Sequence, residues 1–250
     1  ISLSLLLRPQ RRSTTALFNV QGRAIIAMNW KFIRLIDRYV GIPLIYAIVC
    51  ARRLINRPNH APTVHGAKRI LLIKLWGIGN LFMMLPAVSI LKNMHPGVEL
   101  DLLTLASNHE AALRTRAFSN VVILSTPRVG IFLSTVLAAL KVLRRRDYDI
   151  VIDFEQFARF SALCTAFVGR KTTIGFNTAS QHRQLLYSHP VLYHNSFHIS
   201  HSYSLLASAS CLVNNRVAAA ATRFSLECPD RCSSSMLAHY GISAGTFTVL

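Results

Sequence analysis

Apolar and polar positions follow two alternating patterns between residues 69 and 175. Short, almost wholly apolar runs are separated by longer segments whose apolar residues recur at helical spacing. A strand that is apolar throughout is typical of a parallel sheet covered on both faces. The pattern therefore predicts an α/β fold, a Rossmann-like parallel sheet with helices on either side. The expected strands are 69–75, 98–104, 121–124, 149–154 and 172–175, and the expected helices are 81–95, 108–116, 131–146 and 157–168.

A different pattern precedes the sheet, over residues 28–57. An apolar stretch from 39 to 51 contains a glycine and a proline, and lysine and arginine residues flank it on both sides. The stretch is shorter than the roughly 20 apolar residues that a membrane-spanning helix needs. Two interpretations stay open: a basic amphipathic helical segment lying in an anionic membrane interface, or a helix packed on the domain that follows.

The other parts of the chain show no pattern of packed elements. Residues 1–27 form a poorly defined leader in which apolar residues precede basic ones, an order that fits a signal peptide poorly. We expect Met28 to be the working start. The proline-containing residues 58–68 are expected to be a linker. The expected domains are then a Rossmann-like domain over 69–227, a connection over 228–245, and the first strand of a second domain over 246–250.

The charge of the chain is large and unevenly distributed. Its formal net charge is +18, and the first 68 residues contain eleven lysines and arginines but a single acid, Asp37. A hydrophobic content of 52% excludes a disordered chain. We therefore expect a folded protein with anionic partners. The densest basic cluster flanks an apolar stretch, which favours a membrane surface over nucleic acid.

Cysteine and histidine give no indication of a metal site. The five cysteines are scattered and odd in number, which favours a reducing, cytoplasmic compartment over a disulfide framework. Cys228 and Cys232 lack a second pair at zinc-finger spacing. A helix would place His194, His198 and His201 on one face, but no carboxylate accompanies them. We expect histidines that bind no metal.

A glycine turn follows the first expected strand, and ligands bind such sheets at the carboxyl ends of the strands. The turn reads Gly77, Ile78, Gly79, Asn80. The glycines allow a ligand to approach the backbone closely, and the start of the next helix offers N–H groups to an anion. The alternative is an ordinary turn in which Asn80 caps the helix. Phe82 stands where the dinucleotide-binding pattern has its third glycine.

Charged residues follow the fourth and fifth strands. Asp153, Glu155 and Arg159 lie at the end of the fourth strand, a position that favours a catalytic or binding role. The alternative is a solvated turn. Arg183, beyond the fifth strand, is placed to line the same crevice. The candidate catalytic residues are Asn80, Asp153 and Glu155, and the candidate substrate-binding residues are Lys74, Gly77, Ile78, Gly79, Arg159 and Arg183.

Two separated motifs carry a resemblance to a known family. The stretch RILLIKLWGIGNLFMMLPAVSILKNMHPGVELDLLT resembles the opening of the family 9 glycosyltransferases, the ADP-heptose:lipopolysaccharide heptosyltransferases, in which a turn of the form S/G-I-G-D follows the first strand. The stretch RRDYDIVIDFEQFARFSALCTAFVGRKTTIGF is similar to a second motif of that family. The similarity runs from about Arg69 to Ala209, and residues 28–57 match the extra basic, apolar segment of a subgroup.

The resemblance implies the N-terminal, acceptor-side domain of a GT-B glycosyltransferase. The implied reaction is inverting transfer of a heptose or related sugar from a nucleotide-sugar such as ADP-heptose to the lipopolysaccharide or lipid A–core acceptor. It takes place peripherally on the inner, anionic face of the cytoplasmic membrane, without a metal or cofactor. In the family, an acid after the glycine turn is regarded as the base that deprotonates the acceptor hydroxyl.

That acid is replaced here by Asn80. A carboxamide cannot accept the acceptor's proton at neutral pH. Three possibilities stay open: Asp153 or Glu155 takes over the role of base, Asn80 only positions the acceptor through hydrogen bonds, or transfer is slow or absent.

The length of the chain bears on the same interpretation. A whole GT-B enzyme needs a second domain of roughly 100–200 residues, so we expect this chain to be a fragment that lacks most of the donor site. Two other functions remain as alternatives. One is a nucleotide-dependent oxidoreductase, which the missing third glycine and the lack of an acid ending the second strand disfavour. The other is a non-catalytic cationic module that binds membrane or nucleic acid.

Overall fold

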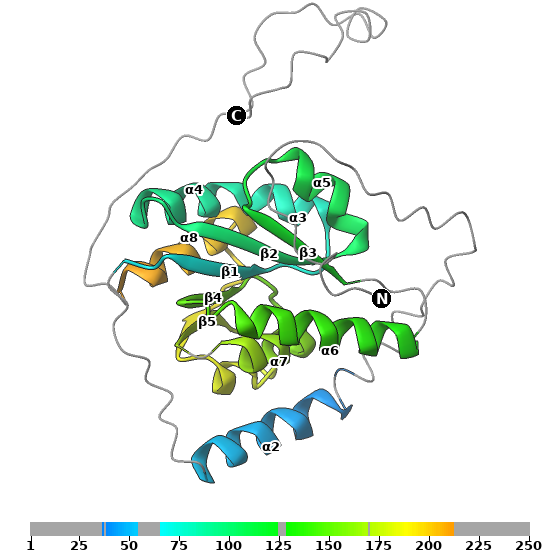
Figure 1. The fold of residues 1–250 in the computed structure, drawn as a ribbon. Helices are drawn as coiled ribbons and strands as arrows, with labels where there is room; N and C mark the ends of the chain where they lie inside the picture. The colour runs from blue at the N-terminus through cyan, green and yellow to red at the C-terminus, as the bar shows by residue number, and fades with distance from the viewer. Residues whose placement is uncertain (1–36, 38, 55–65, 125–128, 170, 213–250) are drawn as a thin grey trace, which may run out of the picture.

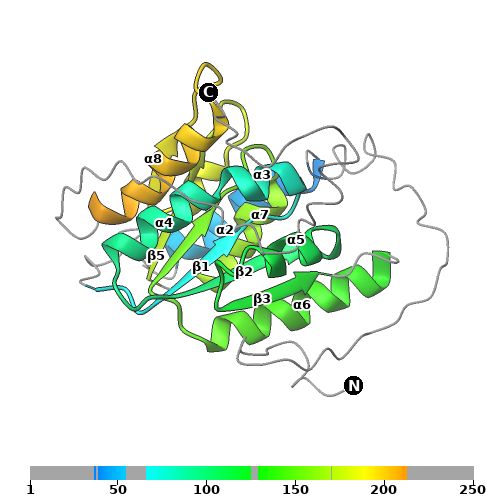
Figure 2. The same ribbon diagram turned by 90° about the horizontal axis from the view of Figure 1, so that it is seen from above.

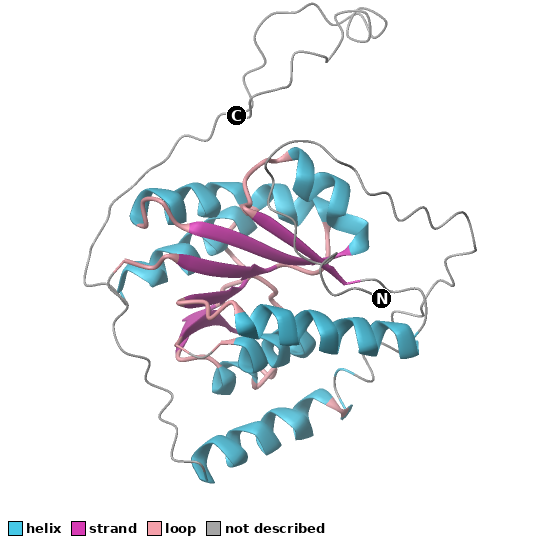
Figure 3. Cartoon of the chain, viewed as in Figure 1, coloured by secondary structure: helices cyan, strands magenta, loops and turns pink. Residues whose placement is uncertain are grey.

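A six-stranded parallel sheet forms the centre of the molecule (Figures 1 and 3). The computed structural model describes residue 37 and residues 39–54, 66–124, 129–169 and 171–212. The strand order β3-β2-β1-β4-β5-β6 confirms the predicted Rossmann-like α/β fold. The strands are β1 (Arg69–Ile73), β2 (Glu99–Leu105), β3 (Asn120–Leu124), β4 (Ile150–Asp153), β5 (Thr172–Asn177) and β6 (His189–Leu192). The expected connection 228–245, the second-domain strand 246–250, and Cys228 and Cys232 lie outside the described residues.

Helices cover both faces of the sheet, and one helix forms a further layer (Figure 1). One face carries α3 (Ile78–Met83), α4 (Leu85–Met94), α5 (His109–Arg114) and α8 (Ile199–Leu212). The other face carries α6 (Val129–Arg145) and α7 (Arg159–Val168), and α2 (Gly41–Leu54) lies outside α7. Two 3-10 turns, η2 (Ala106–Asn108) and η3 (Arg183–Leu186), complete the described elements.

The strands are buried on both faces, as their unbroken apolar sequence predicts. In β1, Ile70 and Leu72 belong to the core under α4 and α8, while Leu71 and Ile73 belong to the core under α6 and α7. All four side chains are fully buried. Successive side chains of a strand point to opposite faces, so a strand between two helical layers must be apolar at every position.

The helix expected over 81–95 is divided at Met84. Helix α3 ends at Met83, and α4 begins at Leu85 with Pro86 in its first turn. Proline lacks the backbone N–H that a continuous helix would use and is favoured in the first turn of a helix, where that N–H is not needed. The single-helix prediction is therefore wrong at this point.

The structure also has a strand that the sequence pattern did not predict. β6 pairs in parallel with β5, with Pro190 opposite Gly175. Proline donates no hydrogen bond and is tolerated in edge strands. Only four residues long, with Leu192 exposed, β6 has none of the continuous burial that marked the other strands.

Helix α2 packs against the domain, which confirms the packed-helix interpretation for its inner side. Ile45 is fully buried and contacts a small cluster that includes Ala162, Leu186 and Tyr187. A Cβ on Gly41 would lie 3.0 Å from Cδ of Arg159, so glycine permits the close approach of α2 to α7. Among the described residues, no helix has the length and hydropathy required to cross a membrane.

Polar contacts join both ends of α7 to α2 and to Asp37, which precedes α2 in the sequence. At the start of α7, Asp37 accepts hydrogen bonds from the backbone N–H groups of Arg159 and Phe160. At its end, the Arg52 guanidinium donates to the carbonyl oxygens of Ala166 (2.8 Å) and Leu186 (3.2 Å). An acid at the N-terminus and a cation at the C-terminus both complement the helix dipole. Helices α2 and α7 therefore run in the same direction.

We predict that Ile45→Ala lowers the free energy of unfolding by about 3 kcal/mol, because it leaves a cavity between α2 and the cluster below. The measurement is urea denaturation followed by circular dichroism. Leu44→Ala is the matched control, since Leu44 is 43% exposed on the same helix and should change stability little. Equal losses in the two variants would contradict the packing of α2.

Candidate active site

The candidate site lies where the carboxyl ends of β1 and β4 meet. These strands are neighbours, with Ile73 opposite Asp153. The connections from β1 lead to β2 on one side, whereas β4 lies on the other. Such a switch point is where open α/β sheets bind ligands, outside the carboxyl ends of the strands. Figure 2 shows the strands pointing toward this common edge.

The glycine turn is the exposed part of the site. Gly77, Ile78 and Gly79 are exposed and Asn80 is half-buried. Gly77 has φ +88°, a conformation that favours glycine, and a Cβ there would lie 3.0 Å from Nδ2 of Asn80, which would have to shift slightly. The alternative in which Asn80 caps the helix is wrong, because Gly77 is the N-cap and Asn80 lies in the first turn.

Glu155 holds the backbone that leads into this turn. Its Oε1 accepts hydrogen bonds from the N–H groups of Leu75 (2.7 Å) and Trp76 (2.9 Å). On the other side, Nδ2 of Asn108 donates to the carbonyl oxygen of Leu75 (2.9 Å). The turn is thus fixed from β4 and from the end of β2, which leaves its outer surface as the part free to meet a ligand.

Lys74 lies beneath the turn as the counterion of Glu155. Its Nζ is 3.1 Å from Oε2 of Glu155, and its side chain is only 1% exposed. Burial lowers the pKa of Lys74 below its usual value, and the Glu155 carboxylate offsets part of that shift. In this conformation the Lys74 ammonium group therefore does not reach solvent, where a substrate would meet it.

Asp153 is the centre of a second buried network. Its Oδ2 accepts hydrogen bonds from Ser161 (2.8 Å), Arg183 (2.7 Å) and Tyr187 (2.7 Å). Its Oδ1 accepts one from the N–H of Glu155 (3.0 Å), which connects the two networks. Burial raises the pKa of Tyr187 well above its usual range, so the phenol stays protonated and donates. Asp153 and Arg183 are both fully buried.

Arg159 is occupied by neighbours of its own. Its Nη1 lies 3.1 Å from Oδ2 of Asp37, while Nε and Nη2 donate to the carbonyl oxygens of Gln181 and Ser180. A substrate anion can reach this guanidinium only by displacing the Asp37 carboxylate. The sequence pattern did not identify Asp37 as its partner, because 122 residues separate the two.

The predicted residues thus fall into three sets. The first comprises the exposed or half-exposed turn, Gly77, Ile78, Gly79 and Asn80. The second is a connected, buried set beneath it, Lys74, Glu155, Asp153 and Arg183. The third set is Arg159 alone, which forms its ion pair with Asp37 and not with a residue of the other two sets. Sequence reasoning missed Ser161 and Asn108, which are ordinary polar residues without a motif.

Other candidates from the sequence are separate from this site. Helix α8 begins at Ile199, so His194 and His198 precede it and the three histidines do not share one helix face. The described part of the chain contains no group of three or more potential metal ligands. At the end of β2, Leu105 occupies the place of the ribose-binding acid of dinucleotide folds.

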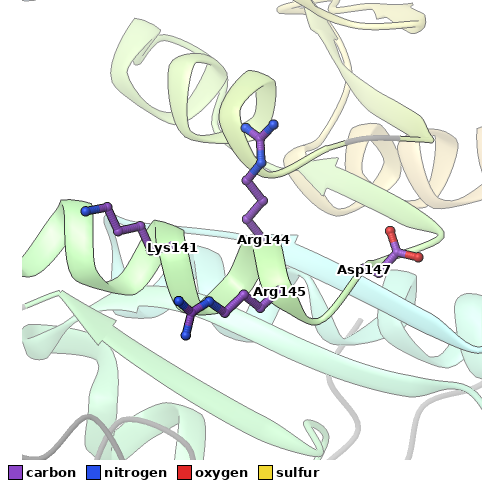
Figure 4. Close-up of a pocket in the computed structure, with 4 residues that line it drawn as sticks. All are labelled: Lys141, Arg144, Arg145 and Asp147. Atoms are coloured by element: carbon purple, nitrogen blue, oxygen red, sulfur yellow. The ribbon is translucent and has the colours of Figure 1, made fainter.

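A basic hollow lies at the amino-end edge of the sheet, away from the turn. Lys141, Arg144, Arg145 and Asp147 line this open hollow of about 320 Å³ at the end of α6 (Figure 4). Arg144 points toward α7 and donates to the carbonyl oxygen of Phe167 (2.8 Å). The hollow therefore adjoins the same end of α7 that Arg52 contacts.

Comparison with known proteins shows similarity in structure. No family model and no curated protein sequence matches the chain. The E. coli heptosyltransferase WaaC, solved with ADP-2-deoxy-2-fluoro heptose, has a TM-score of 0.50 and 19% identity, covering 57% of this chain and 48% of its own. E. coli ADP-heptose lipopolysaccharide heptosyltransferase II has a TM-score of 0.52 and 16% identity, covering 70% and 51%.

A family 9 glycosyltransferase from Veillonella parvula has a TM-score of 0.50 and 14% identity, covering 75% of this chain and 53% of its own. The fold is similar to that of the heptosyltransferases. The resemblance inferred from the two sequence motifs is thereby confirmed at the level of the fold. The chain spans about half the length of these proteins.

We predict that Glu155→Gln lowers the free energy of unfolding by about 3 kcal/mol, because the Lys74 ammonium is left buried without a counterion. Adding Lys74→Met to this variant should restore part of the loss. The measurement is urea denaturation of the three proteins.

Glu110→Gln is the control for this prediction, since Glu110 and Arg114 form an exposed pair in which both side chains are more than 80% accessible. If Glu155→Gln is as stable as Glu110→Gln, the buried pair of Lys74 and Glu155 does not stabilise the backbone that leads into the turn.

Proposed function

We propose that this chain forms the acceptor-side half of a glycosyltransferase of the heptosyltransferase type. A heptose or related sugar passes from a nucleotide-sugar donor such as ADP-heptose to the lipopolysaccharide or lipid A–core acceptor, with inversion. The observation that carries the proposal is the exposed glycine turn at the switch point of this sheet, whose preceding backbone is hydrogen-bonded from below. The fold similarity to WaaC, solved with an ADP-heptose analogue, supports the choice of sugar donor.

The proposed substrate contacts are those of the exposed turn. Gly77 and Gly79 are exposed and have no side chain, so a sugar or diphosphate group can approach their backbone closely beside the exposed Ile78. The half-buried amide of Asn80 both donates and accepts hydrogen bonds, which suits it to orient a sugar hydroxyl. Asn80 is thus proposed to touch the acceptor.

The buried residues act through the turn. In this proposal Glu155 and Lys74 position the backbone of Leu75 and Trp76. Asp153 and Arg183 position Glu155 in turn, through the hydrogen bond from the Glu155 N–H to Asp153. All the oxygens of these two carboxylates already have partners. For either to act as the base, it would have to give up hydrogen bonds that hold the site.

The reaction requires a base that Asn80 cannot supply. The acceptor oxygen forms a bond to the anomeric carbon while the bond from that carbon to the diphosphate breaks, and the hydroxyl proton must leave. General-base catalysis contributes about 10²–10⁴-fold to such steps. We therefore expect sugar transfer to be slow and limited by removal of the hydroxyl proton. The acceptor site itself is complete in this proposal, and transfer takes place on the inner face of the cytoplasmic membrane.

We predict that Asn80→Asp accelerates sugar transfer by about 100-fold, because a carboxylate at this position can accept the hydroxyl proton. The measurement is release of ADP from ADP-heptose in the presence of a deacylated lipid A–core acceptor, with the longest natural form of the protein. Asn177→Asp is the matched control, since it makes the same change at the end of β5 and should have no effect.

The variant Asp153→Asn tests whether Asp153 acts as the base or only positions the turn. With an intact base at Asp153, this variant would reduce transfer more than Asn80→Ala does. Our assignment predicts instead that Asp153→Asn loses stability and activity together, whereas Asn80→Ala weakens acceptor binding in a stable protein. An Asn80→Asp variant no faster than Asn177→Asp would contradict the proposed role of the turn.

A further inference from the structure

The outer face of α2 is apolar, and no other described element covers it. We define it by the exposed residues that recur every three or four positions along the helix and just before it, which are Val40, Pro43, Leu44, Ala47, Ala51 and Leu54. Val40 is 57% exposed, Leu44 43% and Leu54 87%. None of these six residues is charged. A helix on a soluble surface normally presents charged or polar side chains to water, so a continuous apolar stripe indicates a contact surface.

This face cannot turn inward, because the opposite side of the helix is already committed. Ile45 is fully buried against the domain, and Arg52 reaches across to the carbonyl oxygens of Ala166 and Leu186. The stripe therefore faces away from the described part of the domain, on the helix that forms its outer layer (Figure 1). It lies along a helix of 14 residues, about 21 Å in length.

The charge around the stripe is one-sided. Asp37, the single acid of the first 68 residues, turns toward α7 and pairs with Arg159. At the far end of α7, Arg52 and Arg144 bind the adjacent carbonyl oxygens of Ala166 and Phe167. The hollow of Lys141, Arg144 and Arg145 continues from there, with Asp147 as the one acid among its four lining residues (Figure 4). In the sequence, arginine and lysine also flank the helix on both sides.

We propose that the outer face of α2 lies in the headgroup layer of an anionic lipid bilayer. An apolar stripe in a chain of net charge +18 fits this occupant, because acyl chains accept the apolar residues and anionic headgroups attract a strongly basic protein. A second copy of the chain fits less well, since pairing two such faces would bring together two proteins that each have a net charge of +18. At about 21 Å, α2 is too short to cross a hydrocarbon core of about 30 Å, so it lies along the surface.

This contact orients the candidate active site. Helix α2 begins beside Arg159, at the end of α7 that lies on the carboxyl edge of the sheet, and ends beside Ala166. With α2 flat on the bilayer, the carboxyl edge opens alongside the lipid surface. The relevance of that orientation to a lipid-linked acceptor rests on the proposed function, whereas the lipid contact itself does not.

The test is flotation of the full chain with vesicles of phosphatidylcholine alone or with phosphatidylglycerol, without substrates. We expect binding to the anionic vesicles at least about tenfold stronger than to neutral ones and weakened by salt. Leu44→Glu should reduce that binding about tenfold or more. The control is Leu205→Glu on α8, which is 41% exposed on the opposite face of the sheet and should leave binding unchanged.

A second pair of variants locates the contact. Leu44→Trp should be quenched by brominated lipids in the vesicles, and Leu205→Trp should not. Failure of the wild type to float, or equal flotation of Leu44→Glu and wild type, would overturn the proposal. So would a dimer in sedimentation velocity that Leu44→Glu dissociates without any vesicle binding. Since no transfer is measured, these outcomes leave the proposed enzymatic function to its own test.

Discussion

The contact between the Glu155 carboxylate and the end of β1 is the constraint on which the candidate site depends. Two parallel strands that meet at a switch point leave the backbone beyond their ends without ladder partners. Glu155 supplies those partners to Leu75 and Trp76, and it also neutralises Lys74. The Asp153 network then holds the start of the Glu155 loop through a single hydrogen bond. Four buried ionisable residues thus set the shape of an exposed turn that carries no charge.

Much of the fold was predictable from the sequence, because its strands are apolar at every position and are punctuated by glycine and proline. β6 was not, since a four-residue edge strand containing Pro190 owes its conformation to pairing with β5. The division between α3 and α4 followed from Pro86, a signal that was present in the sequence and was outweighed by helical spacing. The local sequence pattern thus predicts an element correctly where its own apolar residues require burial. It does not predict an element, such as β6, whose conformation depends on pairing with a neighbouring strand.

The candidate site was predictable in its location but not in its internal chemistry. The rule that ligands bind at strand ends located the glycine turn, Asp153 and Glu155 correctly at one edge. It could not show that Asp153 is buried, because its partner Arg183 is 30 residues away in sequence and approaches from η3. The same applies to Arg159 and Asp37, which belong to segments on either side of the first four strands. Charge pairs at such separations are properties of the tertiary structure.

The edge strand β6 has a consequence for how this sheet behaves among other chains. The outermost strand of a sheet offers unpaired N–H and C=O groups on which a foreign strand can grow. Pro190 removes one donor from that row, and the strand is only four residues long. Both features blunt the template, so they disfavour pairing with a foreign strand at this edge of the sheet while the protein is folding or crowded.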